Sequence, residues 1–79
     1  MVSNTQKKIN EIAEYRGLPP IKKGWRCEVD GKPGKVWGGN SGANLNILFD
    51  GDNWPMNCHP YWRMKIFNPD GSVVFQSKE

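Results

Sequence analysis

Residues 49–62, FDGDNWPMNCHPYW, carry most of the side chains in this chain that could do chemistry. The stretch holds the carboxylates of Asp50 and Asp52, the thiol of Cys58 and the single histidine, His59. These groups suit three kinds of chemistry: acid–base catalysis by paired carboxylates, nucleophilic catalysis by a thiol, and metal binding. Each kind needs side chains that converge on one point, so the surrounding elements decide among them.

A metal site would combine Cys27, Cys58 and His59 with an aspartate. Zinc takes four converging ligands, which usually come from paired knuckles such as C-x2-C. The neighbours Cys58 and His59 would instead point to opposite faces of a strand. We therefore predict no bound metal. Two cysteines cannot form a disulfide framework, so we expect both to be small buried thiols. A single disulfide between them stays an alternative.

Catalysis is not favoured by the arrangement of these residues. Side chains adjacent in sequence, such as Cys58 and His59, rarely meet, and no third group that would orient the histidine is evident. Asp50 and Asp52 flank a glycine in a turn, where aspartate is favoured because it bonds to nearby backbone. A chain of 79 residues also has little room for a deep pocket. We predict a protein that is not an enzyme and has no cofactor.

Length and charge narrow the class of protein. The 79 residues predict one domain over 1–79, and the net charge of +3 is mildly basic. No apolar run is long enough for a membrane span, and the N-terminus has no apolar signal region. The expectation is a cytoplasmic protein without a membrane partner.

Residues 4–16 are predicted to form a short N-terminal helix. Ser3 and Gln6 fit a capping box at its start, and Gly17 before Leu18-Pro19-Pro20 supplies the stop. The apolar residues Ile9, Ile12 and Ala13 share one face. A helix this short is not stable alone, so its apolar face must dock on another surface.

After the prolines the apolar period changes from 3.6 to 2, which indicates strands. We predict five or six short antiparallel strands, with candidates at residues 25–30, 35–38, 45–50, 54–58, 61–66 and 73–75. The last of these would belong to a C-terminal hairpin. Turn sequences separate them at 30–34, 38–44, 50–53 and 68–71. The core is predicted to contain Val29, Val36, Leu45, Ile47, Phe49, Met64 and Ile66.

The run GWRCEVDGKPGKVWGGNSGANLNILFDGD resembles the opening of an SH3-like barrel, in particular of KOW and Tudor-type modules. The positions that carry the resemblance are Gly24, Val29, Gly31, Gly34, Val36, Phe49, Asp50 and Gly51. HPYW (59–62) is similar to the one-turn helix before the last strand of such barrels. Over residues 24–67 the resemblance implies a mainly β fold: a five-stranded antiparallel SH3-like barrel within 24–76, with the helix and a C-terminal hairpin as additions. This fold hosts many unrelated functions.

The aromatic residues point to a binding surface. A domain this small cannot bury all its large rings, although one reading places most of them in the core. The candidate binding residues are Trp37, Trp54, Tyr61, Arg63 and Lys35. Exposed rings beside Lys and Arg suit a nucleic-acid strand, through stacking and phosphate contacts. The favoured function is therefore a small non-catalytic, nucleic-acid-associated module.

Two alternatives stay open. Exposed rings near Asp50 and Asp52 would suit a cationic or proline-rich peptide. The chain would then be a protein-interaction module, such as an accessory or inhibitor that docks on a larger complex, of the kind common in phages and mobile elements. The least favoured is a small oligomeric enzyme like the plasmid-type dihydrofolate reductases, whose V-Q-I-Y stretch is missing here. A continuous basic stripe beside exposed rings would favour nucleic acid, and an acidic cleft would favour a peptide.

Overall fold

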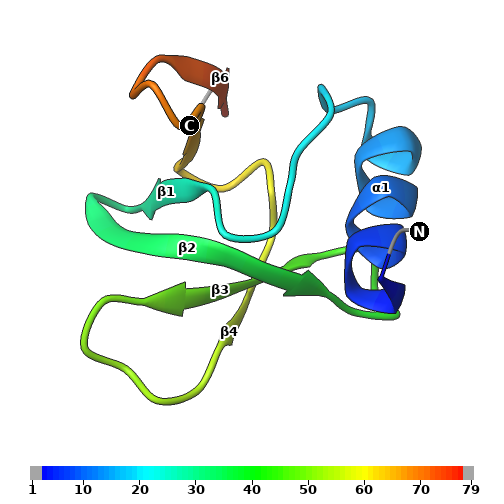
Figure 1. Cartoon of the computed structure of the whole chain (residues 1–79), viewed down its shortest axis with the longest axis horizontal. Coiled ribbons are helices and arrows are strands. Elements are labelled where there is room, and N and C mark those ends of the chain that lie inside the picture. Colours follow the sequence, from blue (N-terminus) through cyan, green and yellow to red (C-terminus); the bar gives the residue numbers. More distant parts are fainter. Residues whose placement is uncertain (1–2, 78–79) are drawn as a thin grey trace.

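The computed structural model describes residues 3–77 and shows one antiparallel sheet with a helix packed on it (Figure 1). The elements in chain order are α1 (Asn4–Arg16), β1 (Arg26–Val29), β2 (Lys32–Gly39), β3 (Leu45–Phe49), β4 (Met56–Cys58), β5 (Met64–Phe67) and β6 (Val73–Gln76). Within this part of the chain no helix is long and apolar enough to cross a membrane.

Helix α1 begins and ends where the sequence predicts. The hydroxyl of Ser3 accepts a hydrogen bond of 3.1 Å from the backbone N–H of Gln6, which caps the first turn. Gly17 ends the helix in the left-handed region, at φ 72°, and Leu18 donates to the carbonyl of Ala13. The predicted helix over 4–16 is thereby confirmed.

The turn between β1 and β2 is tighter than the predicted turn over 30–34. Asp30 and Gly31 alone form it, with φ of 54° and 79°, and Val29 pairs with Lys32. Positive φ at both central residues matches the twist of the two strands, which is why Asp-Gly favours a two-residue hairpin. As a result Pro33 and Gly34 lie inside β2 rather than in a loop.

The fold is mainly β, as predicted, but its sheet is open and does not close into a five-stranded barrel. The strand order is β4-β3-β2-β1-β5-β6, and every pairing is antiparallel. Strand β5 pairs with β1 on one side and with β6 on the other. The two edge strands of the described sheet, β4 and β6, do not pair with each other, so the sheet stays open. The expected one-turn helix at 59–62 is a turn in which Trp62 donates to the carbonyl of His59.

The core lies between α1 and the inner face of the sheet, which we define as the face that carries the buried side chains. Six of the seven predicted core residues are buried there: Val29, Val36, Leu45, Ile47, Met64 and Ile66. Phe49 is only half-buried, because it lies at the end of β3, where the neighbouring strand β4 is short. Gly39 allows α1 close to the sheet, since a Cβ there would lie 2.2 Å from the Cδ1 of Ile12.

Candidate functional site

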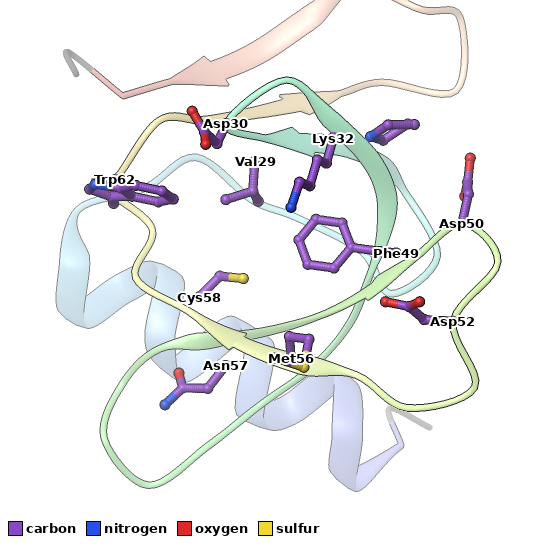
Figure 2. A pocket seen from close by; sticks show the side chains of 11 residues that line it. Val29, Asp30, Lys32, Phe49, Asp50, Asp52, Met56, Asn57, Cys58 and Trp62 are labelled. Carbon is purple, nitrogen blue, oxygen red and sulfur yellow. The ribbon is translucent and has the colours of Figure 1, made fainter.

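A hollow opens on the inner face of the sheet, beside the edge strand β4 (Figure 2). This inner-face pocket has a volume of about 570 Å³. Its apolar lining is Val29, Pro33, Phe49, Met56, Cys58 and Trp62. Its polar lining is Asp30, Lys32, Asp50, Asp52 and Asn57. The volume falls in the range of about 300–1,000 Å³ that is typical of ligand sites.

Strand register brings the apolar lining together. Met56 pairs with Ile47 and Cys58 pairs with Leu45, so both side chains share the inner face with these core residues. Phe49 has the same parity, two residues beyond Ile47 along β3. In Figure 2 the sulfur of Cys58 and the ring of Phe49 lie at the same cavity. Most of the pocket is thus built by the 49–62 stretch.

One wall of the pocket is held by a double link between Asp30 and Arg63. The Asp30 N–H donates to the Arg63 carbonyl at 2.9 Å, and Arg63 Nη1 lies 3.0 Å from Asp30 Oδ1. The guanidinium carbon of Arg63 also lies 5.6 Å from the ring centroid of Trp62. These contacts fix the 59–63 turn, and with it Trp62, against the β1–β2 turn.

The opposite wall is held by Asp50. Its carboxylate takes two hydrogen bonds from Arg26, at 2.9 and 2.7 Å, and its N–H donates to the Pro33 carbonyl at 3.1 Å. The bidentate contact with Arg26 lowers the pKa of Asp50 and raises that of Arg26. The pocket is therefore preformed on two sides.

Lys32 and Asp52 are the two charged lining residues outside these links. Among residues 3–77 both salt bridges are made by the Arg26–Asp50 and Arg63–Asp30 pairs. The Lys32 ammonium points into the cavity, and Asp52 lies on the side near Met56 (Figure 2). The pocket thus combines apolar walls with one unpaired charge of each sign.

The groups with catalytic potential do not converge. Cys27 and Cys58 are free thiols. Burial raises the pKa of Cys27 to about 12, and burial also raises the pKa of Cys58, so both thiols are held neutral. The Nδ1 of His59 accepts a hydrogen bond of 3.1 Å from the backbone of Tyr61. In the described part of the chain, no group of three or more His, Cys, Asp or Glu side chains is placed to hold a metal.

The five predicted binding residues are placed in different surroundings. Trp37 and Lys35 lie on the outer face of β2, where the Lys23 ammonium is 4.5 Å from the Trp37 ring centroid. Tyr61 donates its hydroxyl to the carbonyl of Arg16 and packs edge-on against Phe75. Its ring therefore links the 59–63 turn to α1 and β6.

Trp54 and Arg63 are closer to the pocket. Arg63 is part of its wall, as described above. Trp54 lies in the 50–55 loop and lines a second hollow of about 280 Å³, with Gly51, Asp52, Asn53 and Met56. Sequence reasoning missed Phe49, Met56 and Cys58 as site residues. Phe49 shares the parity of Leu45 and Ile47 on one strand, which was a signal in the sequence, whereas the face of Met56 and Cys58 follows from the register of β4 on β3.

Comparison of the chain with protein-family models, with curated proteins and with solved structures finds no match. Proposals about function therefore depend on the geometry of the site.

Proposed function

We propose that this chain is a non-catalytic protein-interaction module that binds an extended segment of a partner protein in the inner-face pocket. The observation that carries the proposal is a preformed hollow that is walled by Phe49 and Trp62 and flanked by Asp50 and Asp52. A cleft between Asp50 and Asp52 is the feature that favours a peptide over a nucleic acid, although Arg26 pairs with Asp50 and Lys32 also lines the hollow.

The position of the pocket at the edge of the sheet supports an extended ligand. Strand β4 ends the sheet and pairs with β3 alone among the described strands. An extended segment can add to such an edge through its backbone while one of its side chains enters a neighbouring pocket. An apolar side chain suits this pocket, since Val29, Phe49 and Met56 line it and the Lys32 ammonium within it would repel a cation.

We further propose that the fold is SH3-like, with β6 as an addition. The strand order β4-β3-β2-β1-β5 supports this proposal, because it places β1 between β2 and β5 and runs meander-like from β1 to β4. The short turn at 59–63 between β4 and β5 occupies the place of the one-turn helix in such domains.

Nucleic-acid binding is the second candidate function, and Trp37 favours it. Its ring is exposed on the outer face beside Lys23, and Lys35 is exposed on the same strand. A nucleic-acid strand could stack on this ring and place phosphates near the lysines. Such binding would weaken steeply with salt.

The test is a selection of random peptides on the purified protein, followed by affinity measurements on variants. Trp62→Ala removes one pocket wall, and Trp37→Ala removes a ring from the opposite face. We expect Trp62→Ala to weaken the selected peptides by about tenfold, a loss of roughly 1.4 kcal/mol, while Trp37→Ala leaves them unchanged. Salt-sensitive oligonucleotide binding that Trp37→Ala abolishes, without peptide selection, would instead support the nucleic-acid function.

A further inference from the structure

Three tryptophans of this chain expose a large part of their rings, and they differ in what covers them. Trp37 is 39% exposed, Trp62 is 47% exposed and Trp54 is 79% exposed. Lys23 lies over the ring of Trp37, and Arg63 lies over the ring of Trp62. Within residues 3–77, Trp54 is the exposed tryptophan whose ring carries no cation. The indole face attracts cations more strongly than the other aromatic rings do.

An unpaired carboxylate lies beside this uncovered ring. Asp52 and Trp54 line the same 280 Å³ hollow. Asp52 takes part in neither salt bridge of the described residues, whereas Asp30 and Asp50 are each paired with an arginine. A ring that can accept a cation and a carboxylate without a counter-charge therefore adjoin at one point of the surface.

This hollow, which we call the Trp54 hollow, is next to the inner-face pocket. The two share Asp52 and Met56 in their linings. Side chains on one face of an extended segment recur at every second residue, roughly 6.6–7 Å apart. Neighbouring same-face side chains of one segment can therefore reach both hollows.

We propose that Trp54 and Asp52 bind a Lys or Arg side chain of the same partner segment whose apolar side chain fills the inner-face pocket. This inference rests on the proposed function and names the chemistry of its partner: a basic residue that lies two positions from a large apolar residue. The charges separate the two positions: Lys32 lines the inner-face pocket alone and disfavours a cation there, whereas Asp52 also lines the Trp54 hollow, where no lysine or arginine is part of the lining. A phosphate backbone would meet the unpaired Asp52 and is disfavoured at the same place.

The experiment is peptide selection carried out in parallel on the wild-type chain and on Asp52→Asn. On the wild type we expect selected peptides to pair a large apolar residue with Lys or Arg at the second position before or after it. On Asp52→Asn the apolar preference should persist while the basic preference disappears. A charge reversal, Asp52→Lys, should replace the basic preference by Asp or Glu.

Affinities of one selected peptide give the quantitative test. Trp54→Ala and Asp52→Asn should each weaken it by about fivefold, a loss typical of an exposed cation–π or charge contact. Neither should change the affinity of the peptide in which the basic residue is replaced by alanine. Glu11→Gln, which neutralises an exposed carboxylate on α1 outside both hollows, is the matched control and should leave both peptides unaffected. Melting curves verify that each variant is folded.

The outcomes separate this inference from the function on which it rests. Peptides that share an apolar residue but no basic one, with binding sensitive to Trp62→Ala alone, would overturn the inference and leave the interaction module standing. Failure to select any peptide, or selected peptides insensitive to Trp62→Ala, would overturn both. Equal losses with the basic peptide and its alanine version would show that Trp54 and Asp52 do not contact the basic side chain.

Discussion

The two cysteines are the residues whose chemistry depends most on their surroundings. Cys27 is buried in β1 and Cys58 is half-buried at the pocket, and in both cases desolvation raises the pKa of the thiol. A neutral thiol is a poor nucleophile, because the thiolate is the reactive form. Desolvation thus lowers the thiolate fraction of both cysteines for a common physical reason.

The rates of alkylation by iodoacetamide should reflect the burial and the raised pKa values of the two thiols. In the native chain at pH 8 we expect Cys58 to react more slowly than free cysteine, and Cys27 to react more slowly still because it is shielded from solvent and its pKa is about 12. In denaturant both should react at the rate of free cysteine. Mass spectrometry of peptides quenched over time measures each site. Rapid native modification of Cys58 at neutral pH would contradict the assignment.

The Arg26–Asp50 pair predicts a dependence of stability on pH. Because Arg26 lowers the folded-state pKa of Asp50, the pair stabilises the fold above the unfolded-state pKa, near 3.8. That contribution is lost as the pH falls through the lower, folded-state value. Asp50→Asn should therefore lower the melting temperature slightly at pH 7, since the pair is exposed, and this difference should shrink as the pH falls below 3.8.

Melting curves of wild type and Asp50→Asn between pH 2 and 7 measure this difference. Asp52→Asn is a matched control on the same turn, because Asp52 takes part in neither salt bridge of residues 3–77. A gap between wild type and Asp50→Asn that stays constant down to pH 2 would show that the pair does not set the pKa of Asp50.

At the scale of the elements, β2 is the strand on which the sheet depends. It pairs with both β1 and β3, and α1 packs on it near Gly39. Gly34 lies where β2 passes closest to β3: a Cβ there would be 2.8 Å from the Leu48 carbonyl oxygen and 3.0 Å from the Phe49 Cα. The close approach is between backbones, so a change in side-chain conformation cannot relieve it.

Gly34→Ala should therefore destabilise the fold by about 1–3 kcal/mol, the usual cost of overpacking. Chemical denaturation followed by tryptophan fluorescence gives the free energy of unfolding. Lys35→Ala, at the next position and exposed on the outer face, should change it by about 0.5 kcal/mol or less. Equal effects of the two substitutions would mean that the strands can separate at Gly34 at little cost.

At the scale of the whole molecule, the helix and the sheet share one core. Ile9 and Ile12 of α1 are buried with Val36 and Leu45 of the sheet. Gln6 adds polar contacts, since its side chain bonds to the Ile21 carbonyl and the Lys23 N–H at 2.8 Å each. Docking of α1 thus closes the side of the core that the sheet leaves uncovered.

Ile9→Ala should cost about 2–5 kcal/mol, because it leaves a cavity at a fully buried site. We expect helix and sheet to unfold in one transition, so that far-ultraviolet circular dichroism and tryptophan fluorescence give coincident curves. Tyr15→Ala, exposed on the same helix, should change stability little. Separate transitions by the two probes would show that α1 folds independently of the sheet.

The sequence by itself determined the local elements. The N-cap Ser3 and the C-cap Gly17 place α1 at its observed bounds. The alternation of apolar residues places the strands within a few residues of theirs. These signals are local, because caps, turns and periodicity act over a few neighbouring residues. The exposure of several rings also followed from the sequence, since a small core cannot hold them all.

Only the tertiary structure decided how these elements combine into a site. The sheet stays open because its described edge strands, β4 and β6, do not pair with each other, and the pocket depends on the contacts of Arg26 with Asp50 and of Arg63 with Asp30. Each of these contacts joins residues far apart in the chain, so no local pattern encodes them. No local pattern encodes the Trp54 hollow either. Trp54 differs from Trp37 because Lys23, from another segment, covers the ring of Trp37 and leaves that of Trp54 uncovered.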